Sequence, residues 1–103
     1  MRSDEIKRIE RVLKEYRILR YENPEAAAKI NEAVNKLPTE QHKAIILIYF
    51  VGLSRAEAAD ALYCSQQTVR RWCLRAIGRL PRALGHLKRK PSDKLVELYE
   101  RET

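Results

Sequence analysis

The sequence has little glycine and few of the residues from which enzymes build reactive sites. It contains three glycines and two cysteines in 103 residues, and the glycines are too scattered for a phosphate-binding loop. Cys64 and Cys73 lack a zinc-binding spacing, and His42 and His86 stand apart from them. We therefore expect no metal, no cofactor and no catalytic site, and we interpret both cysteines as reduced thiols.

Long hydrophobic runs are also missing. The apolar stretch at 45–51 is far too short to span a membrane, and the charged, amphipathic amino terminus differs from a secretory signal. These features predict a cytoplasmic protein without a membrane partner. Few Gly and Pro residues, beside many Ala, Leu, Glu, Lys and Arg, favour an all-α protein of one small domain.

Positive charge dominates the chain and is unevenly distributed. The net charge is +7, and residues 70–90 contain eight basic residues and no acidic one. Residues 91–103 instead contain four acidic and two basic residues. A basic segment can simply be a solvated helix face, but this one continues directly from a polar helix pattern. That continuity favours a polyanionic partner.

The pattern of a helix-turn-helix spans residues 54–80. Ser54 and Glu57 have the spacing of a capping box, which predicts the start of a helix. A turn of three residues follows, and its last member, Ser65, is expected to cap a second helix. We expect the small Ala59 to face Val69 where the two helices cross.

Polar and basic side chains fill the first turns of the second helix. Gln and Arg pair bidentately with adenine and guanine edges in the major groove, so they predict direct base contacts. The expected base-reading residues are Gln66, Gln67, Arg70 and Arg71, and the expected phosphate contacts are Arg55, Ser65, Thr68 and Arg75. An ordinary solvated face is the alternative, but the capping signals and the acid-free flank favour DNA contact.

Residues 37–80 resemble region 4 of sigma-70-type factors. The resemblance is carried by Leu37, Pro38, Tyr49, Gly52, Leu53, Ser54, Glu57, Ala59, Leu62, Ser65, Thr68, Val69, Arg75, Ala76 and Leu80. It implies binding to promoter-like duplex DNA, often beside RNA polymerase. Tyr63 departs from the pattern because it occupies a turn position where glycine is common. The opening segment 6–23 is also similar to the amino-terminal helix of small phage-encoded regulators of the ArpU type.

The helical patterns divide the chain into three segments. Residues 1–36 are expected to form an amino-terminal helical pair, 37–90 the helix-turn-helix domain, and 91–103 a carboxyl-terminal amphipathic helix. Helices are predicted over 4–21, 24–36, 39–51, 54–62 and 66–80, with Ser3, Asn23 and Thr39 as amino-terminal caps, Gly52 as a left-handed carboxyl-terminal cap and Pro81 as a helix breaker.

The first helix carries an apolar stripe for which two roles are open. The stripe consists of Ile6, Ile9, Val12, Leu13, Tyr16 and Leu19. It either covers the core within one chain or pairs with a second copy in a homodimer.

Three functions compete at this point. The leading hypothesis is a sequence-specific transcriptional regulator that binds duplex DNA. An RNA-associated accessory factor of the signal recognition particle type is the second. A module that docks on RNA polymerase is the third. The Gln and Arg residues of the second helix favour DNA, because folded RNA is recognised more by its shape.

Overall fold

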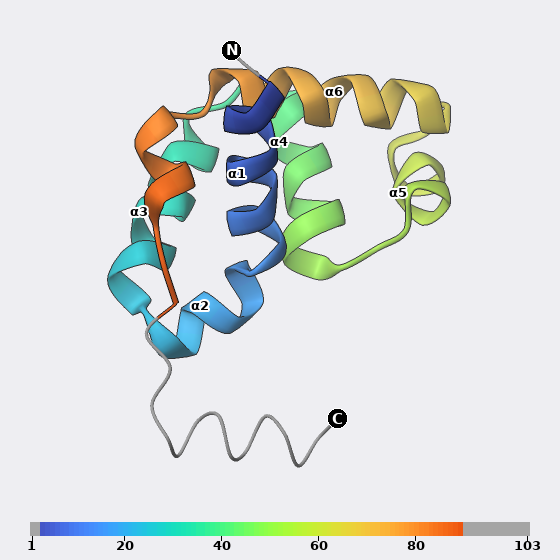
Figure 1. Cartoon of the computed structure of the whole chain (residues 1–103). Helices are drawn as coiled ribbons and strands as arrows, with labels where there is room; N and C mark the ends of the chain where they lie inside the picture. Colours follow the sequence, from blue (N-terminus) through green and yellow to red (C-terminus); the bar gives the residue numbers. More distant parts are fainter. Residues whose placement is uncertain (1–2, 90–103) are drawn as a thin grey trace.

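The computed structural model describes residues 3–89, and every regular element in that range is helical (Figure 1). The elements are α1 (Ser3–Lys14), α2 (Tyr16–Glu22), α3 (Pro24–Asn35), α4 (Thr39–Ile45), the π-helix η1 (Ile46–Val51), α5 (Arg55–Leu62), α6 (Gln66–Arg79) and the 3-10 helix η2 (Arg82–His86). The predicted all-α class is confirmed. The helix expected over 91–103 lies outside the described residues. Within 3–89 no helix is both long and apolar enough to cross a membrane.

The long amino-terminal helix is interrupted, contrary to the predicted continuous helix over 4–21. Glu15 separates α1 from α2, and its amide donates to the carbonyl oxygens of both Arg11 (3.0 Å) and Val12 (3.1 Å). This mixture of α-type and 3-10-type bonding tightens the turn. Ser3 is the first described helical residue rather than a cap outside the helix.

The apolar stripe of these two helices is buried within the chain. Ile9, Val12, Leu13, Tyr16 and Leu19 all lie in the core. The stripe therefore serves as a core cover, and the homodimer expected through it would require the core to open. A homodimer is not shown and stays a prediction.

The remaining helix boundaries follow local chemistry. Asn23 caps α3 as predicted, because its side chain accepts from the Ala26 amide and Pro24 fills the first helical position. The cap predicted at Thr39 is wrong. Pro38 holds the cap position with an extended backbone and makes no side-chain cap bond, so Thr39 is already helical. Gly52 ends η1 with a φ of 90°, as expected.

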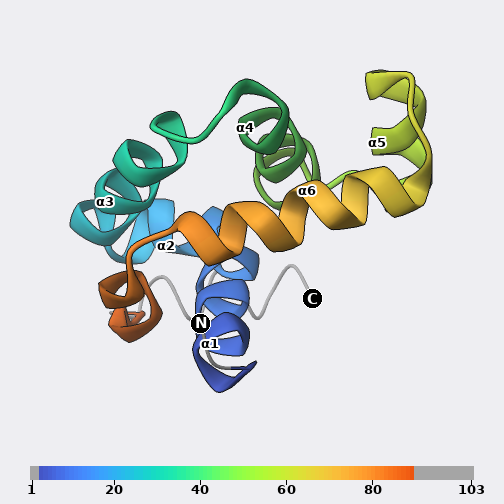
Figure 2. The ribbon, with the colours of Figure 1, turned by 90° about the horizontal axis from the view of Figure 1, so that it is seen from above.

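Helix α6 lies across the molecule and completes the core. Seen from above, it passes between α1 on one side and α3 and α4 on the other (Figure 2). Its inner face consists of Val69, Cys73, Ala76 and Ile77, all buried, and Leu80 continues the same face. Burial of these side chains fixes the rotation of α6 about its axis, so its opposite face must point outward.

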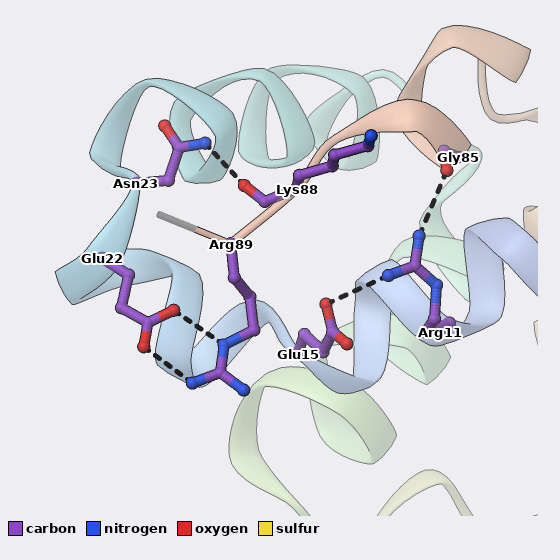
Figure 3. A network of polar contacts seen from close by, with 7 residues as sticks. All are labelled: Arg11, Glu15, Glu22, Asn23, Gly85, Lys88 and Arg89. Carbon is purple, nitrogen blue, oxygen red and sulfur yellow. Dashed lines mark hydrogen bonds and ion pairs between the residues drawn. The ribbon is translucent and has the colours of Figure 1, made fainter. Parts of the chain in front are cut away.

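The chain folds back after Pro81 and forms a strap over α1 and α2. We call residues 81–89 the carboxyl-terminal strap, and Figure 3 shows its polar contacts. The Asn23 side chain donates to the Lys88 carbonyl oxygen at 2.8 Å, and Arg89 donates to both carboxylate oxygens of Glu22 at 2.7 Å. Arg11 reaches the Gly85 carbonyl oxygen at 3.4 Å. The strap thereby fastens the end of α6 to the amino-terminal helices.

The strap also limits how much of the basic segment at 70–90 can attract a polyanion. Arg82 pairs with Glu5 at 3.3 Å, and Arg89 pairs with Glu22. The acids that neutralise this segment come from α1 and α2, so a scan along the local sequence does not reveal them. Unpaired positive charge is therefore concentrated on α6 rather than along the whole segment.

Candidate nucleic-acid interface

The helix-turn-helix begins with the capping box predicted at Ser54. The Ser54 hydroxyl accepts from the Glu57 amide, the Glu57 carboxylate accepts from the Ser54 amide, and both distances are 3.1 Å. The bond that the Ser54 amide donates to the carboxylate lowers the pKa of the Glu57 carboxyl. The box fixes where α5 starts and therefore where the turn after it lies.

The turn between α5 and α6 closes through a left-handed residue. The Cys64 amide donates to the Ala59 carbonyl oxygen at 3.0 Å, and the Tyr63 amide donates to that of Asp60 at 3.3 Å. This pair of bonds defines a Schellman motif. Its geometry forces Tyr63 into the left-handed region, with φ 55° and ψ 47°. The turn therefore forms with tyrosine in place of glycine. The Tyr63 backbone is strained, because Cβ crowds the following carbonyl oxygen in the left-handed region.

Ser65 caps α6 as predicted. Its hydroxyl accepts from the Thr68 amide at 3.1 Å and lies 2.8 Å from the Thr68 hydroxyl. The Thr68 hydroxyl, expected to contact a phosphate, is therefore already engaged by Ser65 and is only partly exposed. Cap and helix together orient the first turn of α6 rigidly.

The four predicted base-reading side chains and one predicted phosphate contact, Arg75, share the outer face of α6. Gln66, Gln67, Arg70, Arg71 and Arg75 are all exposed. Within residues 3–89 none of these three arginines has a hydrogen-bond or ion-pair partner. Helix α6 itself contains no acidic residue. This face therefore presents uncompensated donors that can approach a polyanion.

Arg55 adds a cation at the start of the supporting helix α5. Burial raises the pKa of the Cys73 thiol to about 11, although the positive charge of Arg55 opposes this shift. Burial likewise raises the pKa of the Tyr49 hydroxyl, again against Arg55. Both groups are neutral at neutral pH, so neither supplies a counter-charge. The exposed Arg55 guanidinium has no ion-pair partner among the described residues.

Two features of this surface were not anticipated from the sequence. Leu74 is 48 % exposed and Tyr63 is 96 % exposed, so both present apolar area beside the basic face. Cys73 occupies the inner face of α6, so its neighbour Leu74 points outward. Leu74 follows Gln67 by two helical turns, and this spacing could have predicted that both residues lie on the same face. Trp72 is partly buried against the core, as expected of a packing residue.

Comparison with known proteins identifies this architecture. The family model described as Sigma-70, region 4 matches residues 27–80, slightly more than half of the chain. The chain belongs to the sigma-70 region 4 family. It is also 38 % identical over 63 residues to proteins from two strains of Mycobacterium tuberculosis, both named ECF RNA polymerase sigma factor SigM. That similarity covers 61 % of this chain but only 32 % of each relative, so the chain spans about a third of their length. No solved structure matched.

The family match covers a defined set of structural elements. It begins within α3 and ends at the last residue before Pro81, so it contains the whole helix-turn-helix. Helices α1 and α2 and the carboxyl-terminal strap lie outside it. This region 4 domain is thus a helix-turn-helix of a family that binds DNA in transcription, and its similarity to ArpU-type regulators stays a prediction.

Proposed function

We propose that this region 4 domain is a transcriptional regulator that binds promoter-like duplex DNA by placing the amino-terminal turns of α6 in the major groove. The observation that carries the proposal is the exposed, unpaired outer face of α6, directly behind a capped turn. An α-helix fits the major groove, where Gln and Arg distinguish base pairs. In this arrangement Gln66, Gln67, Arg70 and Arg71 read bases.

The phosphate contacts would come from the rim of the same surface. Arg55 on α5 and Arg75 on α6 flank the reading face, while Ser65 and Thr68 hold the first turn of α6. Phosphate contacts fix register and orientation, whereas base contacts supply specificity. Leu74 would add an apolar contact of the kind made to a thymine methyl group.

Selection of bound duplexes from a random pool tests the proposal, followed by affinity measurements on the selected site and on random DNA. Arg70→Ala or Gln67→Ala should cost about 1–3 kcal/mol on the selected site and much less on random DNA. Arg20→Ala is the control, because Arg20 is exposed on α2, at the far end of the molecule from α6 (Figure 1). Equal weakening on both DNAs would contradict base reading by these residues.

A role beside RNA polymerase is the second candidate function. It is favoured by the relatives, which are named RNA polymerase sigma factors. Retention of polymerase on the immobilised full chain after nuclease treatment would support direct docking. Tighter binding to structured RNA than to duplex DNA at matched salt would instead favour the RNA-associated alternative.

A further inference from the structure

An open groove lies between α3 and the carboxyl-terminal end of α6. Its volume is about 500 Å³, and its basic side chains are Lys29 from α3, Lys36 at the carboxyl-terminal cap of α3, and Arg79 from α6. Glu32 is the single acidic residue in its lining. We call this feature the phosphate groove. It lies beyond the predicted base-reading residues, and its α3 members were not among the predicted site residues.

The charges in the phosphate groove are only partly neutralised. Lys36 pairs with Glu32 at 3.5 Å, but both side chains are more than 70 % exposed, so this pair is weak. Within residues 3–89 neither Lys29 nor Arg79 has an ion-pair partner. Three cations against one loosely held carboxylate favour an anionic occupant.

The position of the groove indicates which anion can reach it. Helix α6 is about 20 Å long, and a helix about 10–12 Å wide nearly fills the major groove. The two DNA backbones must therefore run along the flanks of α6. Arg75 and Arg79 are one turn apart and lead from the reading face to the groove. Figure 2 shows α3 on the opposite side of α6 from α1, so only one flank of α6 carries this groove.

We propose that the phosphate groove binds the sugar-phosphate backbone of the same duplex that α6 reads, and that Glu32 weakens this contact by holding Lys36. The inference rests on the proposed DNA-binding function and extends it to α3. It predicts that α3 acts as a second electrostatic contact that adds affinity without adding base specificity.

Salt titration of duplex binding by the full chain tests the proposal. Lys29→Gln and Arg79→Gln should each lower the slope of log affinity against log salt by roughly 0.9, which corresponds to about an eight-fold loss at 0.1 M salt. The loss should be equal on selected and random DNA. Ethylation of individual DNA phosphates should identify one position at which the ethyl group lowers the affinity of the parent protein but not that of Arg79→Gln.

A variant that breaks the ion pair between Glu32 and Lys36 gives a more specific test of the phosphate groove. Glu32→Gln removes a negative charge from the groove and releases Lys36, so affinity should rise roughly two- to five-fold at low salt. Glu10 and Lys14 on α1 are a matched pair with the same spacing, 3.1 Å apart. Glu10→Gln makes the same charge change on the other flank of α6 and should have no comparable effect.

The outcomes separate the two proposals. If the unmodified chain fails to bind duplex DNA, the proposed function is wrong. If it binds and Arg70→Ala weakens the selected site, while the groove variants have no more effect than Glu10→Gln, the phosphate groove alone is refuted.

Discussion

The left-handed backbone of Tyr63 predicts how a glycine at this position changes the stability of the protein. Tyr63 adopts φ 55° because the Schellman motif requires it, yet its side chain is 96 % exposed and contributes little burial. A non-glycine residue in this region costs roughly 1–2 kcal/mol, because Cβ crowds the following carbonyl oxygen. Glycine removes that cost. We therefore expect Tyr63→Gly to stabilise the protein.

The expected gain is limited by the unfolded chain. Glycine adds conformational freedom to the unfolded state, which costs roughly 0.5–1 kcal/mol relative to alanine. The net increase in the free energy of unfolding should be about 0.5–1 kcal/mol. For a domain of this size that increase raises the melting temperature by roughly 2–8 °C.

Urea denaturation and thermal melting of three variants test this account. Tyr63→Ala keeps the strained backbone and should lie within about 0.5 kcal/mol of the parent. Ala28→Gly, at an exposed position inside α3, should lose about 0.5–1 kcal/mol, which calibrates the ordinary effect of glycine. If Tyr63→Gly is no more stable than Tyr63→Ala, the backbone at this position is not strained and the reasoning fails.

Two further variants probe the packing and the strap. Ala59→Leu adds methylenes to a buried site at the helix crossing and should cost about 1–3 kcal/mol by urea denaturation; unchanged stability would mean that the crossing has room to spare. The hydrogen bonds from Arg89 lower the pKa of the Glu22 carboxyl, so their stabilisation is complete above the ordinary pKa of a glutamate and is lost as the pH falls through the lowered pKa. Glu22→Gln should therefore destabilise the protein at neutral pH, and the difference should shrink as the pH falls through the lowered pKa. A pH-independent difference would exclude this linkage.

Local chemistry explains which parts of the site were predictable. The caps at Ser54, Ser65 and Asn23 depend on side chains that accept from the amide three residues further along the chain, so their spacing is visible in the sequence. Gly52 was recognisable because few other residues tolerate its φ of 90°. Together these signals fixed the turn and hence which residues of α6 point outward.

Other features depend on partners that are remote in the sequence. Arg89 and Glu22 are 67 positions apart, and no periodic pattern connects them. Neither Gly nor Pro marks the break between α1 and α2 at Glu15. The apolar stripe runs through this position, so the sequence pattern predicted one continuous helix. Tyr21 is 69 % exposed, and the Arg20 guanidinium lies 5.9 Å from its ring centroid. The three-segment division of the chain stays a prediction.

Arginines have two roles in this molecule. Those of the carboxyl-terminal strap pair with acids of α1 and α2, whereas those on the outer face of α6 stay unpaired. Acidic residues of α1 and α2 reach the carboxyl-terminal strap but not the outer face of α6. Arg89 binds Glu22 through two hydrogen bonds, and Arg82 pairs with Glu5 at the surface, whereas Arg70 and Arg71 keep their donors exposed. Because neutralised cations attract a polyanion weakly, the amino-terminal helices concentrate the attraction where α6 can read bases. Removing the carboxylate of Glu5, which pairs with Arg82 of the strap, should therefore add nonspecific affinity without adding specificity.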